Sequence, residues 1–341
     1  MRKPSIIALL GISIILVPAL SHGADTTPIE TLKAGYARPS SVPYPVDNPY
    51  SADKAALGER LFFDPRLSGD NRIACATCHD PLLSWSDGLS RGLGHVGIVL
   101  PRRTPTILNA AWIAPLMWDG RKEQLEDQAL VPMAGTTEMN QDVDRLAAKL
   151  AAIRSYDQAF ELSFPGEGLT LQTVAKALAT YERTIVSPVT PFDQWVAGDE
   201  TAISESAKRG FVLFNTTANC AACHSGWNFT DNGFHDIGLP DDDLGRAEIL
   251  GLPSMEHAFK TPTLRDVSRR GPYMHDGSLR TLSAVIDHYR KGGLQRPSLS
   301  DDMRPIDLDA GAERDLIEFL TTLTGAPPAA TAALGSQAIP R

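Results

Sequence analysis

The sequence predicts an all-α protein built from two similar halves. In several segments apolar residues recur at intervals of three and four, the period of a helix with one buried face. Strand-like alternation of apolar and polar residues is nearly absent. A pattern of helix, cysteine motif and loop occurs twice, with the motifs 145 residues apart, and a length of 341 residues is typical of about two domains. Together these observations favour a helical protein with a diverged internal repeat.

Residues 1–23 are predicted to be an export signal. Arg2 and Lys3 precede an apolar run from Ile6 to Leu20, and small residues follow where a signal peptidase reads the chain. The run is too short for a membrane span, and no later segment approaches the roughly 20 apolar residues that a span needs. We therefore expect a periplasmic protein without a membrane span, whose mature chain begins near Ala24.

The charge of the chain bears on its partners. The formal net charge of −9 becomes about −11 once Arg2 and Lys3 are removed with the signal. An acidic balance of this size argues against nucleic acid and favours a soluble protein whose partners are basic or of mixed charge.

The N-terminal domain is predicted to span residues 24–190. After an extended lead-in rich in Pro, Ser and Thr, residues 52–63 form the first segment with a helical period. Two further helices are expected over residues 143–160 and 171–185, where apolar residues again recur at three and four.

The C-terminal domain is predicted to span residues 191–325. Its first helix repeats the spacing of the helix at 52–63: Gly210, Leu213 and Phe214 match Gly58, Leu61 and Phe62. A later helix begins near Leu282 and is expected to stop at Gly292-Gly293, because glycine pairs end helices. A last helix is expected around residues 316–323, before a flexible tail at 326–341.

Two C-x-x-C-H motifs use every cysteine of the chain. They consist of Cys75, Cys78 and His79, and of Cys220, Cys223 and His224. Two thiols one helical turn apart can add to the two vinyl groups of a haem, while the adjacent histidine meets the iron. Redox-active or zinc-binding thiols are the alternative, but two copies with no cysteine left over favour covalent attachment of two c-type haems.

The ligand opposite each proximal histidine decides the chemistry, because a second strong ligand favours electron transfer and an open position favours binding of peroxide. The residues alone leave several candidates. They are His95, His235, His257, His275, His288, the methionines and the tyrosines.

Three segments resemble the superfamily of bacterial dihaem cytochrome c peroxidases and MauG. They are residues 56–64, residues 118–121 with 125–128, and residues 272–279, and the resemblance extends over residues 52–324. It implies two cytochrome c-like domains with long haem-wrapping loops and haems that face a common interface. It also implies that the peroxide-binding haem is in the N-terminal domain, on the first motif.

The resemblance further implies three catalytic residues. Gln128 and Glu138 fall at the glutamine and glutamate of the family's distal pocket, where a carboxylate can move a proton between the two oxygens of peroxide. The alternative for Glu138 is a solvated loop acid. Trp118 matches the tryptophan between the two haems, where an indole can relay electrons; the alternative is a buried aromatic residue.

Two residues favour different members of the superfamily, His95 the peroxidases and Tyr289 the MauG-like proteins. His95, between glycines, lies where the peroxidases carry a loop histidine that binds the resting peroxidatic iron, so it is a possible distal ligand of the first haem; an exposed loop histidine is the alternative. Tyr289 lies where MauG-like proteins have a tyrosine and peroxidases a methionine, so it is the expected distal ligand of the second haem. Met274 and Met255 remain alternatives to Tyr289, which could also simply fill the core of its helix.

Calcium is expected to be absent or weakly bound. The resemblance implies an ion between the domains, held by an asparagine side chain and by carbonyl groups ahead of the His-Asp-Gly sequence. Arg103 replaces that asparagine, and Arg270 begins the carbonyl segment. A guanidinium group has no acceptor atom and cannot bind the ion.

Three functions follow from these expectations. The first is a MauG-like enzyme that uses hydrogen peroxide and high-valent haem iron to oxidise tryptophan side chains of a partner protein, as in maturation of the tryptophan tryptophylquinone cofactor of methylamine dehydrogenase. MauG also has a surface tryptophan where this chain has Ala218, which counts against it. The second is a peroxidase that takes electrons from a small cytochrome c or cupredoxin. The third is a plain dihaem electron carrier, which needs no distal acid.

Overall fold

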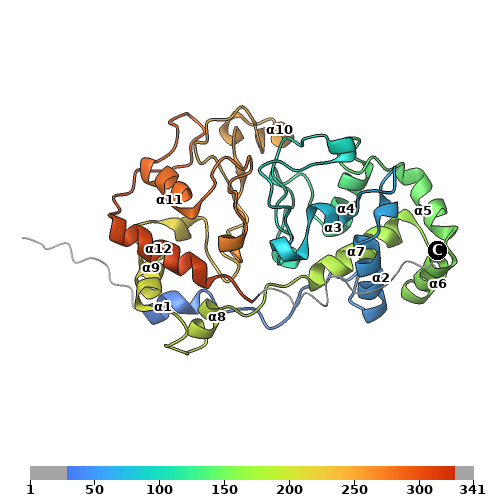
Figure 1. The fold of residues 1–341 in the computed structure, drawn as a ribbon, viewed down its shortest axis with the longest axis horizontal. Helices are drawn as coiled ribbons and strands as arrows, with labels where there is room; N and C mark the ends of the chain where they lie inside the picture. The colour runs from blue at the N-terminus through green and yellow to red at the C-terminus, as the bar shows by residue number, and fades with distance from the viewer. Residues whose placement is uncertain (1–28, 327–341) are drawn as a thin grey trace, which may run out of the picture.

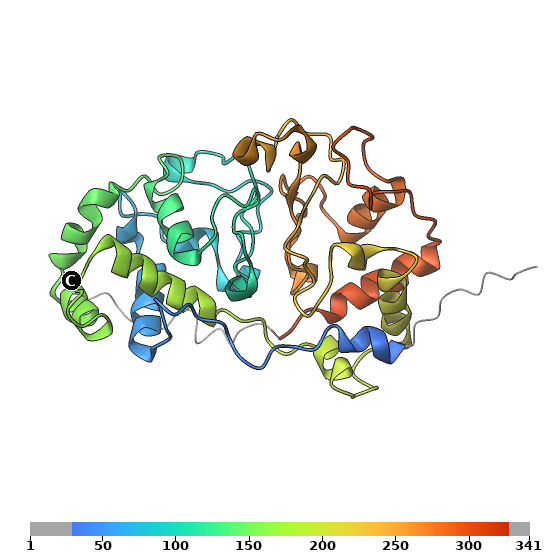
Figure 2. The same cartoon turned by 180° about the vertical axis from the view of Figure 1, so that it is seen from behind.

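The computed structural model describes residues 29–326, and these are predominantly helical as expected (Figures 1 and 2). The helices are α1 (Ile29–Ala34), α2 (Ala52–Phe62), α3 (Cys75–Cys78), α4 (Leu125–Ala134), α5 (Val143–Ala151), α6 (Arg154–Ser163), α7 (Leu171–Thr184), α8 (Pro191–Val196), α9 (Glu205–Asn215), α10 (Ala247–Leu250), α11 (Leu282–Lys291) and α12 (Ala310–Thr322). In the described part of the chain the strands are β1 (Phe234–His235) and β2 (Phe259–Lys260), which pair antiparallel.

The first group of helices packs around a core formed by α2 and α4 to α7. The Ser51 side chain caps α2 by accepting a hydrogen bond from the Lys54 backbone N–H, and Leu57, Leu61 and other apolar residues of one face are buried. Gly58 lies where α2 crosses α7, so close that a Cβ atom would be 2.0 Å from a backbone carbonyl oxygen of α7. The glycine therefore permits this helix contact.

The second group repeats this arrangement with α9 and α12. Gly210 of α9 is the counterpart of Gly58, and a Cβ atom on it would be 1.9 Å from a carbonyl oxygen of α12. Phe211, Phe214 and Phe319 form the centre of the second core. The repeat predicted from the two glycine-containing helices is therefore present in three dimensions.

Two details differ from the sequence-based expectation or extend it. Residues 143–160 form two helices, because the chain turns at Ala152 and at Ile153, which has an extended backbone, so that apolar side chains of both helices reach the same core. The segment around α1 packs on the second core through Tyr36, although it precedes the first core in the chain (Figure 1).

The other helices expected from the sequence are found close to their predicted bounds. Helix α11 ends at Gly292, which adopts a left-handed backbone conformation with φ of 76°. Within residues 29–326 no helix is long and apolar enough to cross a membrane. The predicted signal at 1–23 and most of the predicted tail at 326–341 lie outside the described residues.

Candidate active site

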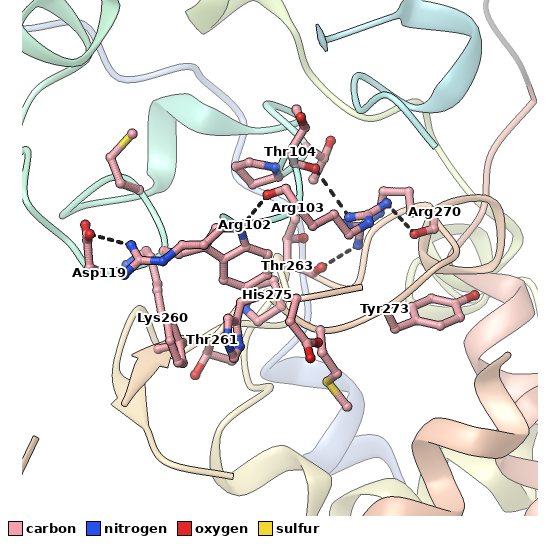
Figure 3. Close-up of a pocket in the computed structure, with 18 of the residues that line it drawn as sticks. Arg102, Arg103, Thr104, Asp119, Lys260, Thr261, Thr263, Arg270, Tyr273 and His275 are labelled. Atoms are coloured by element: carbon pink, nitrogen blue, oxygen red, sulfur yellow. Dashed lines mark hydrogen bonds and ion pairs between the residues drawn. The ribbon is translucent and has the colours of Figure 1, made fainter. Parts of the chain in front are cut away.

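A cavity of about 930 Å³ lies between the two groups of helices and reaches both cysteine motifs. Six of its lining residues are those of the motifs, namely Cys75, Cys78, His79, Cys220, Cys223 and His224. Figure 3 shows a part of this cavity near the boundary between the halves. The structure therefore brings together two attachment motifs that are 145 residues apart.

The two motif histidines are held in the same way. The Nδ1 atom of His79 donates to the Trp85 carbonyl at 3.1 Å, and the Nδ1 atom of His224 donates to the Phe229 carbonyl at 3.0 Å. Burial lowers the pKa of both imidazoles, which favours the neutral form that binds metals. A hydrogen bond at Nδ1 fixes the tautomer and leaves Nε2 as the ligand atom.

The cavity fits two covalently bound haems. All four cysteines are free thiols, and both members of each pair face the space that their histidine faces. The volume is at the upper end of the roughly 300–1,000 Å³ typical of ligand sites. Donor atoms, reactive thiols and space therefore agree with the haem attachment inferred from the sequence.

Gln128 and Glu138 line the cavity together. Gln128 comes from α4, and Glu138 from the loop that folds back beneath it, where the Glu138 backbone N–H donates to the Gly135 carbonyl at 3.0 Å. A Cβ atom on Gly135 would be 2.6 Å from the Glu138 Oε2 atom, so the glycine leaves room for the carboxylate. Burial raises the pKa of Glu138, and the charge of Arg121 opposes this shift.

Trp118 lies at the junction of the two halves. Its indole Nε1 donates to the Arg103 carbonyl at 2.8 Å, and its ring meets the His275 ring edge to face at 6.3 Å between centroids. The junction is reciprocal, since the Arg103 N–H donates to the His275 carbonyl at 2.7 Å and the Lys260 N–H donates to the Trp118 carbonyl at 2.8 Å. The Arg103 carbonyl thus holds the indole directly, and two backbone hydrogen bonds between the halves fix the segment that carries it.

Tyr289 also lines the cavity, from α11. It lies near the second motif, since the Cys220 and Cys223 thiols add to the effect of burial in raising the pKa of its phenol. Met274 lines the cavity as well, whereas Met255 does not. The structure therefore keeps Tyr289 and Met274 at the site. Of the candidate histidines, His235 and His275 also line the cavity, whereas His257 and His288 do not.

His95 does not line this cavity. It begins a short turn, His95–Gly97, and its Nδ1 atom faces the Asp70 carboxylate at 3.6 Å. The ring belongs to a separate, smaller hollow near the surface. The His95 backbone N–H donates to the Thr137 carbonyl at 3.0 Å, so His95 lies beside Glu138 in the fold, but its side chain does not line the cavity with Gln128 and Glu138.

Sequence reasoning missed one polar group of the cavity, Glu182, and left another, His235, among several candidate ligands. Glu182 of α7 is buried, its Oε2 atom has no hydrogen-bond partner among residues 29–326, and burial raises its pKa to about 8. His235 forms an ion pair with Asp231 at 2.7 Å beside the second motif. A glutamate on the apolar face of a predicted helix was the available signal for Glu182; for His235, only its distance of 11 residues from the motif was available.

Fold and site together define a haem-dependent oxidoreductase of the peroxidase type. Comparison with known proteins identifies the family within this class. The family described as di-haem cytochrome c peroxidase matches residues 52–201. The chain is 50% identical to the methylamine utilization protein MauG of Methylorubrum extorquens, over 90% of this chain and 88% of that protein. It is also 50% identical to MauG of Methylophilus methylotrophus, over 92% and 94%.

More distant relatives agree. The cytochrome c551 peroxidase of Nitrosomonas europaea is 31% identical over 82% of each chain. A crystal structure of a MauG-like protein associated with microbial copper homeostasis superposes with a TM-score of 0.78 at 32% identity, over 84% of this chain and 94% of that one. The chain belongs to the dihaem cytochrome c peroxidase and MauG family, and it carries two c-type haems.

Proposed function

We propose that this protein is a periplasmic, MauG-like enzyme that uses hydrogen peroxide to oxidise tryptophan side chains of a partner protein. The observation that carries the proposal is the polar lining of the cavity. Gln128 and Glu138 face the first motif, Tyr289 lies by the second, and His95 faces elsewhere. An uncapped first site and a tyrosine at the second site distinguish the MauG-like pattern from that of the peroxidases.

The proposed roles of the haem-binding residues follow from the geometry of the motifs. Cys75 and Cys78 would hold one haem and Cys220 and Cys223 the other, and the oriented imidazoles of His79 and His224 would each bind an iron. Tyr289 would be a further protein ligand of the second iron. A phenolate is a hard, anionic donor, so it stabilises oxidised iron where a thioether would favour reduced iron.

When bound, the haems supply the iron chemistry that cleaves peroxide. Glu138 takes a proton from one peroxide oxygen and delivers it to the departing oxygen. Its half-buried carboxylate suits this task, because a raised pKa brings an acid closer to the working pH. Gln128 offers an amide to orient the peroxide. Trp118 is held rigidly between the motifs and gives electrons a path that needs no entry of the protein substrate.

The domain and targeting assignments belong to the same proposal. We place one haem in each of the domains at residues 24–190 and 191–325, which each contain most of one hydrophobic core. Export by residues 1–23 would put the enzyme where c-type haems are attached in bacteria. The proposed substrate is the precursor of a tryptophylquinone enzyme such as methylamine dehydrogenase, because MauG relatives are named for methylamine utilization.

The test is to mix the dihaem protein, peroxide and the precursor of methylamine dehydrogenase. Mass spectrometry of the precursor's tryptophan peptides reports oxidation, and the absorbance of the quinone reports its completion. Peroxide without enzyme, and enzyme with Tyr289→Phe, are the controls. Tryptophan oxidation that needs the wild-type enzyme supports the proposal, and unchanged precursor contradicts it.

Cytochrome c peroxidase activity is the second candidate. His95 is next to Val96, which has a left-handed backbone with φ of 48°, in a turn flanked by glycines, and such a turn can rearrange to bring a histidine into the cavity. This candidate predicts rapid oxidation of a reduced small cytochrome or cupredoxin by peroxide. It also predicts that His95→Ala opens the diferric enzyme to peroxide.

A further inference from the structure

Two buried arginines line the cavity at the boundary between the halves. The side chains of Arg103 and Arg270 lie close together (Figure 3), and these residues are only 5% and 6% exposed. Within residues 29–326, no carboxylate oxygen lies within 4.0 Å of either guanidinium group. The other buried arginines of the described residues each pair with a carboxylate, Arg183 with Glu126 at 2.7 Å and Arg265 with Asp193 at 2.8 Å.

Both guanidinium groups have donors left over. Arg103 donates from Nη2 to the Arg270 carbonyl at 2.7 Å and from Nη1 to the Thr104 carbonyl at 3.4 Å. Arg270 donates from Nη2 to the Thr263 carbonyl. Among the described residues, the Nε atoms of both arginines are buried without a hydrogen-bond partner.

An arrangement of this kind is costly without an anion. Removing an ion from water costs several kcal/mol even after the protein relaxes, unless a counter-charge compensates it. Burial, reinforced by the neighbouring Arg103, lowers the pKa of Arg270 to about 10. A third buried cation lies at the corresponding position of the second half. Lys260 precedes Thr261-Pro262 as Arg103 precedes Thr104-Pro105, and its side chain is only 6% exposed. Among the described residues these three buried cations have no carboxylate within 4.0 Å, although the charges of Asp266 and Asp231 partly offset those of Arg270 and Lys260. The free donors of the two arginines can therefore take up a carboxylate.

The haems bring carboxylates to this cavity. Each haem bears two propionate groups at the edge opposite its vinyl groups, and the vinyl groups are fixed at the cysteines of each motif. Arg103 is itself fixed at the junction, since its backbone bonds to both His275 and Trp118. Planar guanidinium groups match carboxylate geometry and bind it with short, charge-assisted hydrogen bonds.

We propose that Arg103 and Arg270 form a binding site for haem propionates at the domain boundary, which positions the haems and raises the reduction potential of the haem whose propionate they hold. The proposal rests on the haem placement given above, but not on the identity of the protein substrate. A fixed cation raises the potential because reduction of ferric iron adds negative charge next to it.

A crystal structure of the wild-type dihaem protein tests the contact directly. We expect a propionate oxygen about 2.8 Å from a nitrogen of Arg103 or Arg270, the usual length of a charge-assisted bond. Guanidinium groups that contact only water, an added ion or protein atoms would overturn the proposal. Neither outcome depends on peroxide or on a partner protein.

Potentials measured by spectroelectrochemistry test the electrostatic effect. In Arg103→Gln and Arg270→Gln, each loaded with two haems, the potential of at least one haem should fall, and Arg103→Lys should restore most of it. The matched control is Arg246→Gln. Arg246 is also at the boundary and donates to the Asp119 and Gly120 carbonyls, but it does not line the cavity, so both potentials should stay unchanged.

Unchanged potentials in fully loaded Arg103→Gln and Arg270→Gln would overturn the electrostatic part of the proposal. Should a neutral variant fail to fold, the wild-type crystal structure still decides whether the two guanidinium groups hold a propionate. A shift in Arg246→Gln equal to that in Arg103→Gln would also count against a specific site.

Discussion

Replacing Glu138 by Gln should slow the reaction with peroxide while making the folded protein more stable at neutral pH. Glutamine has almost the shape of glutamate but cannot accept a proton. General acid–base groups contribute about 100-fold to 10,000-fold in rate, which corresponds to about 3–5 kcal/mol of the activation barrier. Stopped-flow absorbance of the Soret band after mixing with peroxide measures this rate.

The raised pKa of Glu138 fixes the sign of both effects. The carboxylate must be ionised to take a proton, so the wild-type rate should fall as the pH drops through a pKa above the usual value of about 4.3. For stability the sign is opposite. An acid whose pKa is raised by folding stabilises the protein below its unfolded pKa, and this contribution is lost as the pH rises through the folded pKa. The neutral amide avoids that loss.

Two further variants separate proton transfer from packing. Gly135→Ala keeps the acid but displaces it, because the added Cβ atom would be 2.6 Å from the Glu138 Oε2 atom, and it should slow the reaction with little change in stability. Glu123→Gln removes a charge from an exposed position nearby and should change neither property. A Glu138→Gln protein that reacts at the wild-type rate, without loss of the acidic limb of the pH profile, would refute the reasoning.

Three further predictions concern stability and ions. Arg102→Ala removes the cation that pairs with the buried Asp119 at 2.5 Å and with Asp243 at 2.7 Å, while Arg121 still pairs with Asp119 at 2.6 Å. Urea unfolding should therefore show a loss of about 2 kcal/mol, whereas an unchanged midpoint would mean that the Arg102 pairs contribute nothing net. Gly58→Ala should lower the free energy of unfolding by at least about 3 kcal/mol in the same assay. In the control Gly35→Ala, where the added Cβ atom would have its nearest neighbour at 3.5 Å, the free energy of unfolding should change by no more than about 0.5 kcal/mol. Equal effects would contradict the helix contact at Gly58. Metal analysis should find no stoichiometric calcium, and chelators should not change activity. The reason is that the Arg103 guanidinium donates to the Arg270 carbonyl, which belongs to the segment expected to bind the ion, and has no acceptor atom of its own. A calcium ion bound at full occupancy would contradict this.

The helices that the sequence predicted carry their own local signals, whereas α4 was not predicted and α1 lies in the segment expected to be extended. Capping side chains, apolar periods and the Gly292-Gly293 stop lie within a few residues of one another, and Gly58 and Gly210 reveal the repeat by their spacing alone. The break between α5 and α6 was not predictable, because the apolar period continues across Ala152 and Ile153 and only the shared core requires a turn there.

The residue types of the site could be predicted from the sequence, but the contacts between the two halves of the molecule could not. The haem motifs stand out by residue type and spacing, whereas Glu138 and Tyr289 were identified through the resemblance to the family. The reciprocal hydrogen bonds between Arg103 and His275 and between Lys260 and Trp118 depend on how the two halves meet, which no local pattern records. The orientation of His95 toward Asp70 is likewise a result of tertiary packing.

The most direct test of the central claim is rapid mixing of the diferric protein with one equivalent of hydrogen peroxide, with no reductant present. Absorption and EPR spectra then show which haems react. The MauG-like account predicts an immediate reaction that alters both haems, a product that lasts until protein substrate is added, and loss of its persistence in Tyr289→Phe. A diferric protein that stays unchanged until one haem is reduced would contradict the account and would assign the protein to the gated peroxidases.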